Sequence, residues 1–180
     1  MSSSVPTATM ILGVDPGLAA LGYGVLTSAG PRLSLVAHGV LRTQRHADVG
    51  VGRDLTLRIG ELARAFEAVL DEHRPDSAAI EEFRFYGKSV TSSLQVANVV
   101  GMLREALRAR GIPAAEYSAR DIKRSVTGNA NASKAQVQKL VKLHVGMTDL
   151  PRPEHAADAL AAAITHAQRS AFARAIERSS

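Results

Sequence analysis

The chain has 180 residues, of which 46% are hydrophobic, no cysteine, and a net charge of +5 at pH 7. This length suits one domain with its own hydrophobic core, and the lack of cysteine excludes disulfides and thiolate metal sites. No stretch approaches the ~18 apolar residues of a membrane span, and the first residues lack the basic start and apolar core of a signal peptide, so we expect a cytoplasmic protein.

The first elements in the chain are predicted to be strands. Residues 9–15, TMILGVD, form an apolar run that ends at Asp15 and is followed by the turn signal PG. The preceding residues 1–8 are expected to be a disordered tail. Two further strand-like runs, LGYGVLTS and RLSLVAHGVLRT, flank the turn residues AGP, which predicts an antiparallel meander. The glycines in the first run are expected where neighbouring backbones come close.

Helices alternate with strands in the middle of the chain. Apolar residues recur at intervals of three and four from about residue 52, which predicts an amphipathic helix that ends before Pro75. DSAAIEE and IPAAEY predict two short strands. Between them, a long helix is expected from about Ser89 to Arg110. Its expected buried stripe is Val96, Val100, Leu103 and Leu107, and its small-residue side is Ser92, Ser93, Ala97 and Gly101.

Three helices are predicted to complete the chain. SARD at 118–121 and SKAQ at 133–136 are N-terminal capping signatures, separated by the loop TGNANA. The last helix begins around Pro153 and is rich in alanine through Ala167. The order of elements predicts an α/β fold over residues 9–175, with a five-stranded mixed β-sheet flanked by α-helices.

Positive charge is concentrated in one segment. Residues 104–142 hold nine Lys or Arg against three acidic residues, a net charge of +6, so the remainder of the chain has a net charge of −1. This distribution indicates a polyanionic partner, although some of these side chains fit the simpler interpretation of solvated helix faces.

Acidic residues stand at two predicted strand ends and in the last helix. Asp15 ends the first strand, and Glu81 and Glu82 end the fourth. The sequence EHAAD places His155 and Asp158 three residues apart, on one face of a helix. Such a set suits phosphodiester hydrolysis with two divalent ions about 3.5 to 4 Å apart. Simpler readings are an Asx turn at Asp15 and a solvated strand end at Glu82.

The segments ILGVDPGLAALGYGV, AAIEEFRF, SARDIKRSVTGNANASKAQVQ and EHAADALAAAITHA together resemble the RuvC family of Holliday-junction resolvases over nearly the whole chain. The resemblance implies an RNase H-like fold and a homodimer. It also implies a Mg²⁺- or Mn²⁺-dependent endonuclease that makes paired nicks in a four-way DNA junction, with a branch-migration motor complex as a further partner. On this pattern Asp15, Glu81 and Asp158 match the first, second and last catalytic carboxylates.

His155 departs from the pattern, because many family members carry an aspartate at that position. Imidazole suits Mn²⁺ better than Mg²⁺, so we expect two ions held by Asp15, Glu81, His155 and Asp158, with stronger activation by Mn²⁺. Glu154 is an alternative oxygen ligand, although it points about 100° away from His155 on a helix.

The resemblance also implies DNA contacts. Lys123 and Lys134 match family positions implicated in DNA binding, and Arg120 and Arg124 fall in the same predicted helix as Lys123. The loop TGNANA is either a backbone contact to DNA or only a connector.

An aromatic residue just beyond the second carboxylate acts near the junction crossover in the family, where its ring stacks on bases or wedges between them. Spacing leaves open whether Phe83 or Phe85 corresponds, and we prefer Phe85. The alternative is that these aromatics belong to the core. Two symmetric nicks require two sites, for which the small-residue side of the long helix is the expected homodimer interface.

Three other functions compete with this interpretation. A nucleotide-binding lobe of the actin and sugar-kinase type also opens with DxG and a hairpin, but the chain is too short for two such lobes. A junction-binding protein with weak or no nuclease activity fits the His155 departure, while the retained carboxylates argue against it. A ribonuclease H or exonuclease on the same fold would differ in its substrate.

Overall fold

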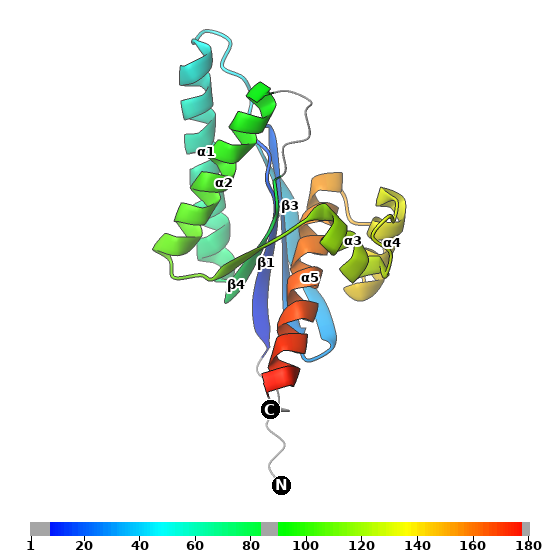
Figure 1. Cartoon of the computed structure of the whole chain (residues 1–180). Coiled ribbons are helices and arrows are strands. Elements are labelled where there is room, and N and C mark those ends of the chain that lie inside the picture. Colours follow the sequence, from blue (N-terminus) through cyan, green and yellow to red (C-terminus); the bar gives the residue numbers. More distant parts are fainter. Residues whose placement is uncertain (1–7, 84–89, 178–180) are drawn as a thin grey trace.

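The structure is a computed structural model that describes residues 8–83 and 90–177. A five-stranded sheet in the order β3-β2-β1-β4-β5 lies between two groups of helices (Figure 1). The strands are β1 (Thr9–Asp15), β2 (Ala20–Ala29), β3 (Arg32–Arg42), β4 (Ser77–Glu81) and β5 (Ala114–Tyr117). The helices are α1 (Val51–His73), α2 (Val90–Ala109), α3 (Ala119–Thr127), α4 (Lys134–His144) and α5 (Glu154–Glu177). The predicted order of elements is confirmed.

The sheet is mixed, as the sequence predicts. β1, β2 and β3 form an antiparallel meander, whereas β1 pairs in parallel with β4, and β4 in parallel with β5. The carboxyl ends of these three parallel strands therefore meet at one edge of the sheet, where ligands gather in α/β folds.

The core has two layers because β1 is buried on both faces. Leu12 and Val14 pack in one hydrophobic cluster with residues of α1 and α2. Ile11, which points to the opposite face, packs in the other cluster with residues of α3, α4 and α5. Figure 1 shows these two helical layers on either side of the sheet.

The long helices differ from the sequence predictions in detail. In α2, Val99 is fully buried and belongs to the stripe, while the predicted Val96 is only half-buried. Val99 lies four residues before Leu103, so these two side chains share one face. Helix α5 continues beyond the alanine-rich stretch and ends at Glu177.

The two predicted capping signatures are confirmed. The Ser118 side chain accepts a hydrogen bond from the amide of Asp121 at the start of α3, and Ser133 and Gln136 form a complete capping box at the start of α4. Among the helices in residues 8–83 and 90–177, none has the length and hydropathy that a membrane crossing requires.

Candidate active site

Asp15 and Glu81 end neighbouring parallel strands. Val14 pairs with Ile80 across β1 and β4, so Asp15 and Glu81 occupy the next position of each strand. Side chains alternate along a strand, which turns both carboxylates toward the face that α5 covers. The sequence prediction that these two residues share one site is thus supported by register and by face.

Glycines on the sheet allow α5 to approach closely. A Cβ atom at Gly13 would lie 1.9 Å from the backbone oxygen of Ala159, and one at Gly22 would lie 2.0 Å from that of His155. Only residues without a side chain tolerate such contacts. The expectation of close backbone approach, made for the glycines of LGYGVLTS, is confirmed at Gly22, and Gly13 adds an approach that the sequence did not predict. The first turn of α5 therefore lies directly over the end of β1.

This approach joins the predicted helix residues to the strand ends. The Nδ1 atom of His155 lies 2.7 Å from Oδ2 of Asp15. Asp158, one helical turn further on, is partly buried with 25% of its side chain exposed. Both residues line the same cleft as Asp15 and Glu81, with a volume of about 340 Å³.

Lysines from α3 and α4 form the opposite side of the cleft. Lys123 and Lys134 both line it. The Nζ atom of Lys134 lies 3.8 Å from Oδ2 of Asp158 and makes a shorter ion pair with Glu154. Sequence reasoning did not foresee the pairing of Glu154 with Lys134, because these residues lie on different helices and no local pattern connects them.

Burial and mutual repulsion make the carboxylates hard to ionise. Burial, followed by the charges of Asp15 and Asp158, raises the pKa of Glu81 to about 7. Burial also raises the pKa of Asp15 and of Asp158, against the hydrogen bond from His155 in the first case. Such crowding is typical of sites that recruit a compensating cation.

The donor chemistry of the cleft fits a divalent cation, since carboxylate oxygens and an imidazole converge there. As the side chains lie, no group of three or more His, Asp or Glu within residues 8–83 and 90–177 is arranged to hold an ion. His155 contacts one carboxylate oxygen of Asp15, and Lys134 lies near one of Asp158. These contacts must open before the same oxygens can face a cation.

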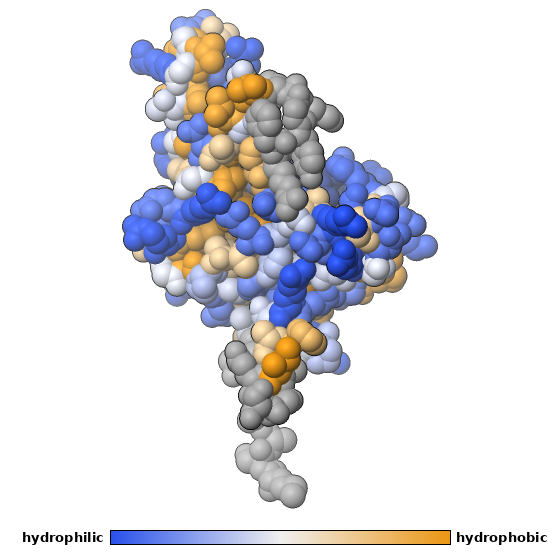
Figure 2. Space-filling view, viewed as in Figure 1, coloured by the Kyte–Doolittle hydropathy of each residue, from blue (hydrophilic) through white to orange (hydrophobic). Residues whose placement is uncertain are grey.

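The predicted DNA-binding residues divide into two groups. Lys123 and Lys134 face the cleft, whereas Arg120 and Arg124 are exposed on α3 and do not line it. Figure 2 shows hydrophilic surface over α3 and α4, next to the cleft. Phe83 is half-buried two residues beyond Glu81. The preferred Phe85 lies outside the described residues.

Comparison with known proteins identifies the family. Residues 11–166 match the family model of the crossover junction endodeoxyribonuclease RuvC. RuvC of Brevibacillus brevis is 36% identical over 162 residues, which cover 90% of this chain and 93% of that protein. RuvC of Treponema pallidum is 38% identical over 163 residues, which cover 91% of this chain and 80% of that protein.

Solved structures agree. RuvC of Thermus thermophilus in complex with a Holliday junction substrate superposes with a TM-score of 0.81 at 29% identity, covering 92% of this chain and 96% of that chain. RuvC structures have the RNase H-like fold, so that prediction is confirmed, and divalent-metal use accompanies the family. The chain belongs to the RuvC family of crossover junction endodeoxyribonucleases.

Proposed function

We propose that this protein resolves four-way DNA junctions by two symmetric nicks, with Asp15, Glu81, His155 and Asp158 as the reacting centre of each site. The observation that carries the proposal is the cleft in which acidic residues from β1, β4 and α5 face Lys123 and Lys134. Clustered carboxylates repel a phosphodiester unless cations intervene, whereas lysines attract it. Their combination in one cleft suits hydrolysis of a phosphodiester.

The chain's own residues have separable roles in this mechanism. Lys123 and Lys134 bind the scissile phosphate, because they are the cationic side chains that line the cleft. Asp15, Glu81, Asp158 and His155 would hold two divalent ions, Mg²⁺ or Mn²⁺. When bound, the ions supply positive charge that offsets the charge of the reacting phosphate and acidifies the attacking water. In the cleft without metal, His155 instead holds the Asp15 carboxylate through its hydrogen bond.

Paired nicks require two such sites, and a homodimer with twofold symmetry provides them most simply. The small-residue side of α2 supports this interface: Ala97 and Gly101 are exposed, and a Cβ at Gly101 would meet no atom of the described residues within 4 Å. Val90 and Leu94, with 62% and 60% exposure, extend the same helix as apolar surface. Figure 2 shows hydrophobic surface over the N-terminal part of α2. We infer that α2 meets its symmetry mate.

Other parts of the proposal rest on the family resemblance. Phe85 is the ring expected at the junction crossover, with Phe83 as the alternative. Arg120 and Arg124 would contact phosphates outside the cleft. A branch-migration motor complex is the expected partner, and a chromosomal DNA substrate implies action in the cytoplasm. One domain over residues 9–175 is sufficient for all these contacts.

A labelled four-way junction tests the proposal directly. The wild-type protein and Asp15→Asn are incubated with the junction and either Mg²⁺ or Mn²⁺, and products are resolved on denaturing gels. We expect paired nicks at symmetric positions with ligatable ends, absent with Asp15→Asn although that variant still binds the junction. Binding without nicking by the wild-type protein would instead favour a junction-binding protein, and trimming from strand ends would favour an exonuclease.

A further inference from the structure

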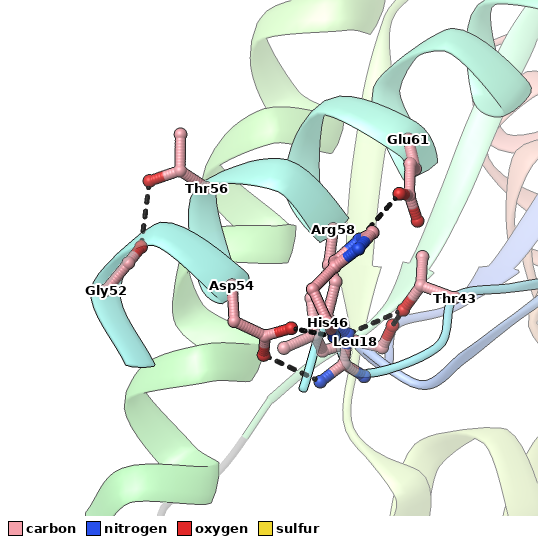
Figure 3. A network of polar contacts seen from close by, with 8 residues as sticks. All are labelled: Leu18, Thr43, His46, Gly52, Asp54, Thr56, Arg58 and Glu61. Carbon is pink, nitrogen blue, oxygen red and sulfur yellow. Dashed lines mark hydrogen bonds and ion pairs between the residues drawn. The ribbon is translucent and has the colours of Figure 1, made fainter. Parts of the chain in front are cut away.

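A buried polar network connects α1 to the turn that follows Asp15 (Figure 3). The network includes Thr43, just after β3, and Asp54 and Arg58 on α1, with exposures of only 8%, 6% and 7%. None of these residues lines the active-site cleft. Their sequence pattern gave no reason to expect a site.

Thr43 attaches directly to the turn of residues 16–19. Its hydroxyl donates a hydrogen bond to the backbone oxygen of Leu18 at 2.7 Å, and its amide donates to that of Ala19 at 3.3 Å. These residues follow Asp15 by three and four positions. The turn is tight, since a Cβ at Gly17 would lie 2.4 Å from the backbone oxygen of Ala20.

Arg58 determines the direction of the Thr43 hydroxyl. Its Nε atom donates to Thr43 Oγ1 at 2.9 Å. A threonine hydroxyl has one proton, and an arginine only donates, so the lone pair of Thr43 faces Arg58 and its proton is left for Leu18. Two consecutive hydrogen bonds therefore connect Arg58 through Thr43 to the turn.

Arg58 is itself held in place. Its Nη1 atom lies 3.5 Å from Oδ2 of Asp54, and Oδ1 of Asp54 accepts the His46 amide at 2.7 Å. The hydrogen bond from the His46 amide, more than the charge of Arg58, keeps the pKa of Asp54 below its usual value. His46 in turn contacts Glu61 at 2.8 Å through its ring.

Stability alone is a weak explanation for this arrangement. A buried ion pair gains little net stability over apolar residues of similar size, because both charges lose their water. What the network does supply is a fixed position for the turn at the carboxyl end of β1. Catalytic groups depend strongly on position, and a displacement of about 1 Å can cost on the order of 100-fold in rate.

We propose that Arg58 and Thr43 are positioning residues for Asp15. They hold residues 16–19 so that the Asp15 carboxylate stays in the cleft beside Glu81 and within reach of His155. This inference rests on the proposed role of Asp15. Both residues lie outside the lining of the cleft, so they would act on the reaction through Asp15.

The test compares substitutions at Thr43 with a matched substitution elsewhere. Thr43→Val keeps the shape of the side chain but removes the hydroxyl, and Thr43→Ser restores it. Thr165→Val is the control, because Thr165 is also buried and also donates to a backbone oxygen, that of Ala161 at 2.8 Å. Its helix position is far from the turn in sequence and outside the lining of the cleft.

Single-turnover nicking at saturating junction and metal is measured for each variant, together with junction affinity and hydrogen exchange at the amide of residue 43, which donates to the backbone oxygen of Ala19. For Thr43→Val we expect a nicking rate lower by about 10- to 100-fold. We also expect faster exchange at the amide of residue 43, and junction affinity within about twofold of the wild type because the basic residues are unchanged. Thr43→Ser should recover most of the rate, and Thr165→Val should keep the wild-type rate even if it unfolds at lower temperature.

The proposal fails if Thr43→Val nicks as fast as Thr165→Val, or if Thr43→Ser nicks no faster than Thr43→Val. If Thr43→Val does not fold, Arg58→Lys carries the comparison, because it keeps a charge beside Asp54 and removes the guanidinium Nε donor. An unchanged nicking rate and unchanged exchange at the Thr43 amide would then overturn the proposal. Loss of the proposed function is recognised separately, because Asp15→Asn would then nick normally.

Discussion

His155 and Asp15 are 140 residues apart in the sequence, yet their side chains meet at 2.7 Å. The contact exists because Gly22 lets the first turn of α5 lie against β2. It places an imidazole beside the carboxylates of the cleft, so on the proposed set of metal ligands His155 would bias the choice of metal. Nitrogen ligands suit Mn²⁺ better than Mg²⁺, which favours oxygen.

We predict that the wild-type protein nicks junctions several-fold faster in saturating Mn²⁺ than in saturating Mg²⁺. His155→Asp should lower this ratio toward one by raising the rate in Mg²⁺. Initial nicking rates across a titration of each metal provide the measurement, with Asp15→Asn as the inactive reference. Equal or faster nicking of the wild type in Mg²⁺ would remove the assigned role of the imidazole.

The raised pKa of Glu81 predicts how the stability of the metal-free protein depends on pH. Its value of about 7 in the folded chain exceeds the ordinary 4.5. The folded state therefore binds this proton more tightly than the unfolded state, and the resulting stability is complete below pH 4.5 and is lost as the pH rises through 7. Asp15 and Asp158, whose pKa values are also raised, contribute in the same direction.

Glu81→Gln should remove the loss of stability that ionised Glu81 causes at high pH. We expect the variant to gain on the order of 1 to 3 kcal/mol in free energy of unfolding at pH 8, at about 1.4 kcal/mol per pKa unit, and little at pH 5. Urea unfolding with a chelator at both pH values provides the measurement. Glu82→Gln is the matched control, because it removes the same charge from the neighbouring residue, which does not line the cleft. Equal effects of both substitutions would show that the cleft does not raise the pKa of Glu81.

The sequence could predict the parts of the site that depend on local pattern. Asp15 and Glu81 end apolar runs, and the alternation of side chains along a strand then decides their common face. The helix spacing of His155 and Asp158 is equally local. The contacts of His155 with Asp15, Lys134 with Glu154, and Thr43 with Leu18 join distant segments. They depend on how α5, α4 and the turn after β1 pack against the rest of the fold. No short sequence motif determines the distances between elements that pack in this way.

Lys123 and Arg124 are neighbours on α3 that provide a matched pair for DNA binding. Lys123 lines the cleft, whereas Arg124 is exposed outside it. We predict that Lys123→Gln lowers the saturated nicking rate at least tenfold, while Arg124→Gln mainly weakens binding. Each lost phosphate contact should make the slope of log affinity against log salt shallower by about 0.9. A larger loss of nicking rate with Arg124→Gln would place the scissile phosphate outside the cleft.

We predict that Glu154 competes with DNA for Lys134. The carboxylate of Glu154 is ion-paired with the Lys134 ammonium, and both side chains are largely exposed. An exposed pair contributes little to stability, so its main effect here is on the availability of Lys134 for phosphate. Glu154→Gln should therefore tighten junction binding by about two- to fivefold and steepen the salt slope by about 0.9, because one more lysine becomes free to neutralise a phosphate.

Junction affinity is measured in a chelating buffer, where no cleavage occurs, over a series of salt concentrations. Glu105→Gln is the control for the change in net charge, since Glu105 is also exposed and paired, with Arg108 at 2.8 Å, on a helix that contributes no residue to the cleft. If the loss of one negative charge only strengthened the general attraction to DNA, both variants would bind more tightly to the same extent. Because Glu154, unlike Glu105, is paired with a cleft lysine, a salt slope that steepens for Glu154→Gln and not for Glu105→Gln would identify Lys134 as the released cation. Adding Lys134→Gln should then abolish the gain.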